Sequence, residues 1–209
     1  MARPRKFDQQ TALTAAQDAF WARGYEATST RDLTTAMGMT QPSLYNAFGD
    51  KRSLFLQVLD FYLDHNLRER TSRLSKLPSP AAAISGFFAE SIARSLADPE
   101  HRGCLLVNTA LEVTAQEPEL RQKVSEEFER MRSFFRDRLV AAQLSGEISA
   151  AGPVEDTASQ LLALVLGVRV LARTAPDRLL LESAVRPALA SLGLPPLAPP
   201  AAVAGTGTG

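Results

Sequence analysis

Few residues of this sequence suit catalysis, metal binding or disulfide formation. Its 209 residues include one cysteine, Cys104, and two histidines. A single cysteine cannot form a disulfide within the chain, so a reducing compartment, the cytoplasm, is expected. The HExxH, P-loop and dinucleotide-binding motifs are missing as well. We therefore expect no metal and no cofactor.

An excess of charge of one sign and long apolar runs are missing too. Basic and acidic side chains each number 23, so the formal net charge is zero and the chain is not a general polycation. The first 55 residues hold seven basic and five acidic residues, which permits phosphate contacts there. The longest apolar run, residues 161–172, contains Arg169 and is too short to span a bilayer. The basic N-terminus is followed by no apolar segment of a secretory signal, so we expect a soluble protein without a membrane partner.

The sequence does have helical periodicity along most of its length. Apolar side chains recur three and four residues apart, and no period-two pattern typical of strands is found. Pro187 falls inside the last predicted helix and is expected to kink or shorten it. The tail from residue 194 is rich in Pro, Ala, Gly and Thr, and we expect it to be disordered. The periodicity predicts an all-α fold of nine helices, over about residues 8–23, 29–37, 40–48, 50–76, 81–96, from 104, 119–144, 154–173 and 177–192.

Residues 29–48 predict two short helices joined by a tight turn, the spacing of a DNA-reading helix-turn-helix. Ser29 and Asp32 resemble a capping box at the start of the first helix. Gly38 stands where a helix ends in a left-handed residue, and Thr40 can cap the second helix. An ordinary helical hairpin is the alternative interpretation of this segment taken alone.

The second of these helices is predicted to present a polar outer face. Leu44 and Phe48 are four residues apart and point inward, which leaves Gln41, Ser43 and Asn46 outside with Tyr45. Such a face fits the major groove, where a glutamine or asparagine amide can pair with adenine in a bidentate manner.

The N-terminal pattern resembles that of the tetracycline-repressor (TetR) family of bacterial transcription regulators. Ala47 departs from the His or Tyr that the family often has before Phe48. The residues that match the family pattern are Phe20, Gly24, Tyr25, Ala27, Thr28, Ser29, Leu33, Ala36, Gly38, Leu44, Tyr45, Phe48 and Lys51.

This resemblance implies a homodimeric repressor that binds a palindromic double-stranded DNA operator and is released by a small-molecule or electrophile effector. It also implies a DNA-binding domain with its arm over residues 1–50 and a linking helix over about 51–76. A ligand-binding and dimerisation domain follows over residues 77–193, and a tail over 194–209. A ligand-responsive activator and a protein-binding adaptor are the alternatives.

The resemblance and the polar chemistry together predict the contacts to DNA. Lys51 starts a helix, where its charge adds to the positive helix end. The basic residues Arg3, Arg5 and Lys6 form an arm suited to a minor groove. The predicted DNA contacts are Thr28, Arg31, Thr40, Gln41, Pro42, Ser43, Tyr45, Asn46 and Lys51.

Two further surfaces are predicted beyond residue 80. The apolar helix around residues 161–172 suits either a buried core or one half of a dimer interface, and we favour the interface. The phenylalanines at positions 87, 88, 134 and 135 suit either a ligand cavity or plain core. The predicted interface comprises Leu161, Leu162, Val165, Leu166, Arg169, Leu181, Val185 and Ala188. The predicted cavity comprises Phe87, Phe88, Ile92, Cys104, Met131, Phe134 and Phe135.

Cys104 allows two interpretations. The run of residues 102–108, with Glu112 after it, resembles a branch of the family that includes regulators responding to thiol-reactive compounds. A helix start and the neighbouring Arg102 and His101 favour a thiolate. The alternative is a small buried hydrophobic residue, the commonest role of a lone cysteine.

An enzyme has little support from the acidic residues. Glu126 and Glu127 are adjacent on a long helix that is otherwise charged, so we expect both on a solvated face. Sequence-specific DNA binding is therefore the favoured function.

Overall fold

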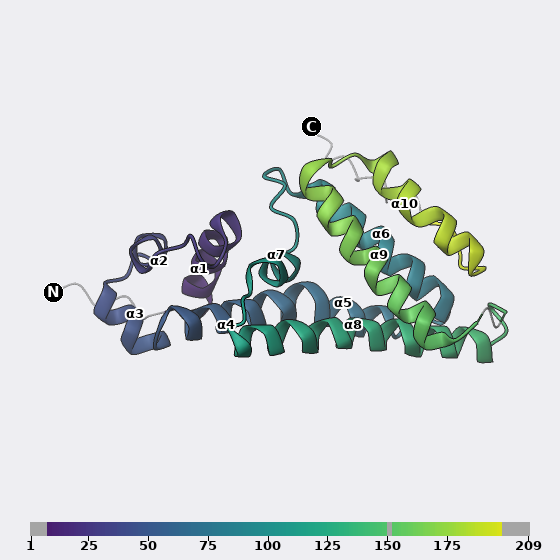
Figure 1. Ribbon diagram of the computed structural model, residues 1–209, viewed down its shortest axis with the longest axis horizontal. Coiled ribbons are helices and arrows are strands. Elements are labelled where there is room, and N and C mark those ends of the chain that lie inside the picture. Colours follow the sequence, from purple (N-terminus) through teal and green to yellow (C-terminus); the bar gives the residue numbers. More distant parts are fainter. Residues whose placement is uncertain (1–7, 150–151, 198–209) are drawn as a thin grey trace, which may run out of the picture. The chain divides into compact units, whose positions relative to one another are not determined.

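The computed structural model describes residues 8–149 and 152–197, and all regular elements in these ranges are helical (Figure 1). Counting the uninterrupted run α4, η1 and α5 as one helix gives nine helices in the described ranges, as predicted. The elements are α1 (Gln9–Arg23), α2 (Thr30–Met37), α3 (Gln41–Phe48), α4 (Lys51–Leu63), the π-helical η1 (Asp64–Arg68), α5 (Glu69–Leu74), α6 (Pro80–Ala97), α7 (Leu105–Glu112), α8 (Pro118–Leu144), α9 (Val154–Thr174) and α10 (Arg178–Ser191).

The caps predicted around α2 and α3 are confirmed. The Asp32 N–H donates to Ser29 Oγ at 3.1 Å, and the Ser29 N–H donates to Asp32 Oδ2 at 2.9 Å. Hydrogen bonds from Ser29, and then the Arg23 guanidinium, lower the pKa of Asp32 to about 2, so this cap is ionised at neutral pH. Gly38 ends α2 with φ 62° and ψ 34°, and Thr40 caps α3. These bonds fix where both helices begin and end.

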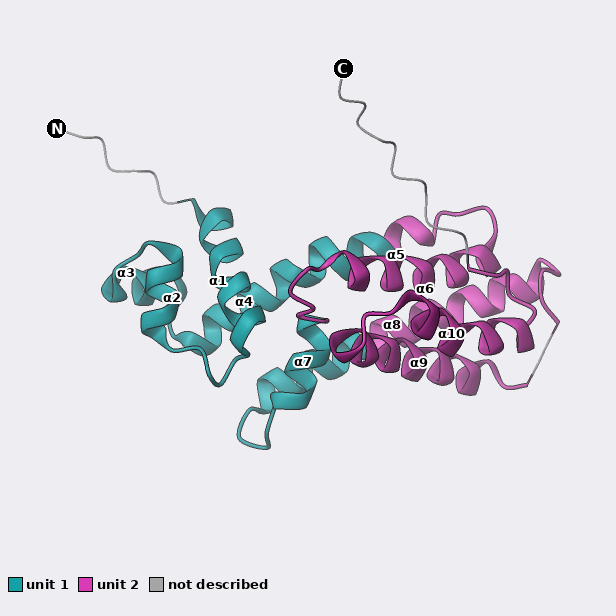
Figure 2. Cartoon of the chain, turned by 90° about the horizontal axis from the view of Figure 1, so that it is seen from above, with its two compact units in different colours: residues 1–70, 104–128 teal, residues 71–103, 129–209 magenta. Residues whose placement is uncertain are grey.

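The chain forms two compact units, coloured separately in Figure 2. Unit 1 comprises residues 1–70 and 104–128, and unit 2 comprises residues 71–103 and 129–209. Helix α7 and the first part of α8 therefore pack with the N-terminal helices. The predicted division by function, with its boundary near residue 76, stays a prediction.

The core of unit 1 is formed where α1, α3 and α7 pack against α4, and where α2 packs against α1 and α3. Phe20, Leu33 and Leu44 are fully buried in it. The Phe20 and Phe55 rings meet edge to face, with their centres 4.8 Å apart. Because α2 and α3 have only eight residues each, this burial stabilises them more than their own hydrogen bonds do.

A network of ion pairs joins α4 and η1 to the first part of α8. The Arg68 guanidinium pairs with Asp60 at 2.9 Å, with Asp64 at 2.8 Å and with Glu127. Lys123 pairs with Asp60 at 2.6 Å. Glu127 is only 1% exposed, so its predicted place on a solvated face was wrong. The sequence showed a charged helix but not the arginine that pairs with this carboxylate from a distant segment.

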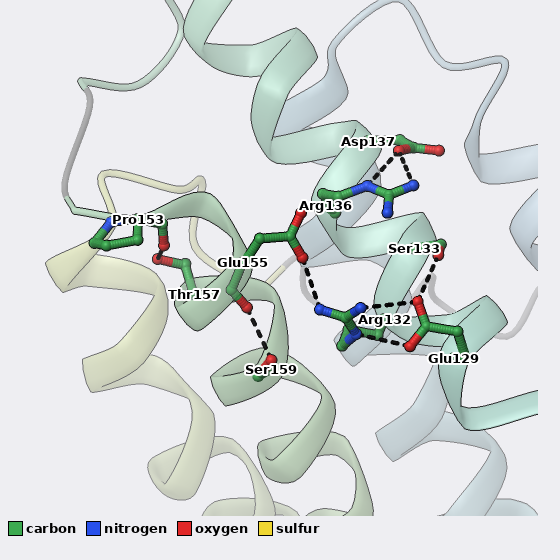
Figure 3. A network of polar contacts seen from close by, with 9 residues as sticks. All are labelled: Glu129, Arg132, Ser133, Arg136, Asp137, Pro153, Glu155, Thr157 and Ser159. Atoms are coloured by element: carbon green, nitrogen blue, oxygen red, sulfur yellow. Dashed lines mark hydrogen bonds and ion pairs between the residues drawn. The ribbon is translucent and has the colours of Figure 1, made fainter. Parts of the chain in front are cut away.

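In unit 2, α6, α9 and α10 pack against one another and bury Leu161, Val165 and Leu181. Arg132 of α8 pairs with Glu155 of α9 at 2.7 Å and with Glu129 of its own helix (Figure 3). The ion pair with Glu155 therefore joins α8 to α9, in addition to the apolar packing of α9 against α6 and α10.

The remaining expectations concern the last helix, the two ends of the chain and membrane spanning. Helix α10 continues through Pro187 to Ser191, so the proline does not end it. The tail beyond residue 197 and the basic arm with Arg3, Arg5 and Lys6 lie outside the described residues. In the described ranges, the helices lack the combination of length and apolar character that crossing a membrane requires.

Candidate nucleic-acid interface

Helix α3 presents a polar face that is held from behind. Leu44 is fully buried and Phe48 is 3% exposed, so the helix has one orientation against its unit. The outer residues are exposed, and the Tyr45 side chain is 43% exposed. The exposed residues of this segment are Thr40, Gln41, Pro42, Ser43, Tyr45, Asn46 and Ala47.

An open groove of about 760 Å³ borders this helix. Its walls come from the first residues of α1, from the turn between α2 and α3, and from α3 itself. Thr40, Ser43 and Asn46, three of the predicted DNA contacts, line it. The hydroxyls of Thr40 and Ser43 lie 2.8 Å apart. The groove therefore brings short polar side chains together beside the predicted reading face.

Lys51, the first residue of α4, is held against the turn between α1 and α2. Its Nζ donates to the Glu26 carbonyl oxygen at 3.2 Å and lies 4.6 Å from the centre of the Tyr25 ring. Burial, then the nearby Glu117 and Glu26 carboxylates, raise the pKa of Tyr25, so the ring under the ammonium stays neutral at physiological pH. A lysine held in this way has a defined position and still has N–H groups for a phosphate.

Thr28 differs from the prediction. Its side chain is fully buried, and its hydroxyl donates to the Gly24 carbonyl oxygen at 2.6 Å. The hydroxyl is thus used within the protein, and we no longer assign Thr28 a phosphate contact. The sequence pattern placed it at the start of a helix but could not show which way it points. Arg31, three residues later, is exposed as a phosphate contact requires.

Comparisons with known proteins agree with this geometry. Residues 12–58 match the model for bacterial regulatory proteins of the tetR family, and residues 80–188 match the model for the tetracyclin repressor-like C-terminal domain. The chain is 33% identical to the uncharacterized HTH-type transcriptional regulator YezE of Bacillus subtilis, over 83% of this chain and 88% of that protein. It is 29% identical to the HTH-type transcriptional repressor ComR of Escherichia coli, over 82% of both proteins.

A solved structure is similar over nearly the whole chain. It is a cysteine-substituted form of the TetR family transcriptional regulator CifR, complexed with a 26-bp double-strand operator DNA. It is 36% identical to this chain, covers 90% of this chain and 99% of its own, and gives a TM-score of 0.82. The chain belongs to the TetR family. It is thus a DNA-binding transcriptional regulator, and the relatives that define this assignment are regulators rather than enzymes.

Within this TetR-family fold the predicted ligand-cavity residues of unit 2 form packed core. The Phe87 ring centre lies 5.4 Å from that of Phe134 and 5.1 Å from that of Phe135, and Phe88 stacks on Phe135 at 5.7 Å. Phe87, Phe88 and Phe135 are fully buried, and Ile92, Met131 and Phe134 are at most 7% exposed. These side chains fill the space between them, so the alternative interpretation, plain core, describes them better.

Most of the predicted dimer residues also face the inside of their own unit. Leu161, Leu181 and Val185 are fully buried and Val165 is 2% exposed. Arg169 donates to the Ser91 carbonyl oxygen at 3.1 Å and to Ser95 Oγ at 2.7 Å, both on α6. Leu162, Leu166 and Ala188 are only half-buried. The sequence showed an apolar helix correctly but could not tell its inner face from its outer face.

The opposite face of α9 is the exposed one. Ala163, Gly167 and Val170 each lie two residues after a buried residue of α9, about 200° around the helix axis, and Leu171 borders them. Val170 is 45% exposed and Leu171 is 38% exposed. In α10, Leu179 is 68% exposed. Apolar surface on both helices is thus left without cover in the single chain.

Cys104 directly precedes α7 as its N-cap and is half-buried. The Tyr62 hydroxyl donates to its Sγ at 3.5 Å. Arg102, expected to favour a thiolate, pairs with Asp98 and Glu100 at 3.4 and 3.3 Å.

Tyr25 and Glu112 were not among the predicted site residues. Glu112 Oε2 accepts the Tyr25 N–H at 2.7 Å, across 87 residues of sequence. The only sequence signal was an acidic residue at the end of a helix, where it is unfavourable.

Replacing Thr28 with valine should lower the free energy of unfolding by about 1–2 kcal/mol, because the half-buried Gly24 carbonyl oxygen loses its donor. Thr28→Ser keeps the hydroxyl and should lose less. Urea denaturation of both variants measures the difference. Equal stability of the valine variant and the wild type would contradict the structural role of this hydroxyl.

Proposed function

We propose that the protein is a repressor that binds a palindromic operator as a homodimer, with α3 of each protomer in the major groove. The observation that supports this most is the exposed polar face of α3 on a helix held by Leu44 and Phe48. Gln41 and Asn46 are suited to base edges, and Arg31, Ser43 and Lys51 to phosphates. The two-fold symmetry of a dimer predicts half-sites about one helical turn apart.

Tyr45→Ala should weaken binding to a duplex selected from random-sequence DNA by the wild-type protein, by about 1–3 kcal/mol. The exposed ring then no longer contacts the DNA, whereas the buried side of α3 is unchanged. Fluorescence anisotropy measures the affinity. Tyr45→Phe is the matched control, since it separates contacts of the ring from those of the hydroxyl.

Lys51→Ala should behave differently from the change at Tyr45. It should weaken binding to all DNA sequences alike. The salt slope, that is, the slope of log K against log salt concentration, should fall in magnitude by about 0.9, the value for one phosphate. Unchanged isotherms for both the Tyr45 and the Lys51 variants would exclude α3 and the start of α4 from the interface.

For the dimer, we propose the outer face of α9, defined by Ala163, Gly167, Val170 and Leu171, together with exposed leucines of α10. Exposed apolar side chains on two helices that pack together are typical of a surface that a second protomer covers. Gly167 lies within it, and a Cβ added there would have no atom within 4 Å in the single chain. A glycine at such a point allows close approach of a second helix. This face replaces Leu161, Val165, Leu181 and Val185 as the proposed contact surface.

Gly167→Arg should yield a monomer that no longer binds the selected duplex. The single chain has room for the new side chain and the helix gains propensity, so only a partner would be displaced. Ser125→Arg, on an exposed position of α8, is the matched control and should stay dimeric. Sedimentation velocity at micromolar concentration measures both. A wild type that sediments as a monomer, or an unchanged Gly167→Arg dimer, would overturn this surface.

We further propose that a thiol-reactive effector acts at Cys104, as in the family branch whose motif this segment resembles. The support is local: Sγ lies beside the start of α7 and accepts the Tyr62 hydroxyl, and both features stabilise a thiolate. An adduct on Sγ would displace Tyr62, which is 3% exposed on α4. Since α4 begins at Lys51, a disturbance at Cys104 can reach the DNA-binding residues within unit 1.

N-ethylmaleimide should release the wild-type protein from the selected duplex and leave Cys104→Ser bound. The thiolate forms a bond to one alkene carbon, the alkene π bond breaks, and the other carbon takes a proton. Anisotropy during titration with the reagent follows release. Equal release of the serine variant, or no release of the wild type, would reject the sensor role and leave Cys104 as a packing residue.

A further inference from the structure

Glu112 makes an unusual contact from the last turn of α7. Its Oε2 accepts the backbone N–H groups of Tyr25 at 2.7 Å and of Glu26 at 3.4 Å. Both belong to the turn between α1 and α2, which leads into the helix-turn-helix. A carboxylate at the C-terminal end of a helix faces the negative end of the helix dipole. The two N–H groups offset that disadvantage with charge-assisted hydrogen bonds.

The approach of Glu112 to the turn requires Gly24. A Cβ on Gly24 would overlap the Glu112 carboxylate, and the residue also adopts a φ of 86°. The remaining polar groups of Gly24 are used inside the unit: its N–H donates to the Phe20 carbonyl oxygen at 2.7 Å and its carbonyl oxygen accepts the Thr28 hydroxyl. The turn is therefore held both by hydrogen bonds to nearby residues of the chain, Phe20 and Thr28, and by Glu112 of α7.

The same turn positions Lys51. The Glu26 carbonyl oxygen accepts from Lys51 Nζ, and the Tyr25 ring lies under that ammonium. The two residues whose N–H groups bind Glu112 are thus the two residues that contact Lys51. A peptide rotation that breaks the contact with Glu112 would move the carbonyl oxygen and the ring together.

We propose that Glu112 is a positioning residue for DNA binding: its carboxylate fixes the turn of residues 24–26, and that turn fixes the Lys51 ammonium against the DNA backbone. This inference rests on the proposed DNA-binding function. It makes the end of α7 a control point for affinity, although Glu112 itself carries the wrong charge to bind a phosphate.

Simple electrostatics gives the opposite expectation. Removing a negative charge near a DNA-binding surface should strengthen binding. Positioning predicts weaker binding instead, because Lys51 loses its support. The sign of the effect therefore separates the two explanations.

The test uses the full-length dimer and the duplex selected by the wild type. Glu112→Ala should bind at least about fivefold more weakly, and its salt slope should fall by about 0.9. Glu112→Asp keeps the charge but is one methylene shorter, so it should resemble Glu112→Ala. Glu112→Gln keeps an acceptor oxygen at the same reach and should stay within about twofold of the wild type.

Coupling to Lys51 is the second readout. In a Lys51→Ala background, Glu112→Ala should change the affinity less than about twofold, since the residue it positions is already gone. Glu126→Ala, an exposed glutamate on α8, is the matched control and should leave affinity and salt slope unchanged. Thermal denaturation and sedimentation verify that each variant is folded and dimeric, and Glu112→Asp takes the place of the alanine variant should that one unfold.

Either of two results would overturn the proposal. One is an unchanged or stronger affinity of Glu112→Ala and Glu112→Asp. The other is a loss of affinity that is equal in the wild-type and Lys51→Ala backgrounds. A wild-type protein that selects no DNA sequence would instead overturn the proposed function, so the two failures are distinguishable.

Discussion

The predicted reading face depends on the burial of two side chains. Helix α3 has eight residues, too few to be stable alone in water. Leu44 and Phe48 are buried against the rest of unit 1, and Thr40 caps the helix start. Without those contacts, no rigid helix would present polar groups to a groove. The proposed reading of DNA thus depends on buried apolar residues as well as on the polar residues predicted to contact DNA.

Local signals predicted the local structure well. The cap of Ser29 with Asp32, the left-handed Gly38 and the cap at Thr40 each depend on a few neighbouring residues, so the sequence contains all the information that decides them. Helix limits set by glycine and proline agreed within one or two residues for the same reason.

Long-range contacts could not be predicted in this way. Thr28 matched the family pattern, but the pattern does not show that its hydroxyl points inward, to the carbonyl oxygens of Gly24 and of Ala19 in α1. Helix α9 is apolar on two faces, and only the presence of α6 and α10 shows that Val165 faces inward and Val170 outward. The spacing of the phenylalanines in α6 and α8 is the same for a cavity lining and for a packed core, so the sequence could not distinguish the two. Glu112 binds a turn 87 residues away, and nothing near it in the sequence predicts that turn.

The π-helical segment η1 has a consequence for how the chain tolerates changes in length. The Glu69 N–H donates to the Asp64 carbonyl oxygen, five residues back. The turn that this hydrogen bond closes contains one residue more than an α-helical turn. Every side chain after Arg68 is therefore rotated by about 100° relative to an uninterrupted α-helix. Deleting one residue here would keep the run helical but reset that phase, and it would rotate the side chain of Arg70, buried in unit 1, out of its present orientation. Length in this stretch is thus constrained by rotational register, even though the segment remains helical throughout.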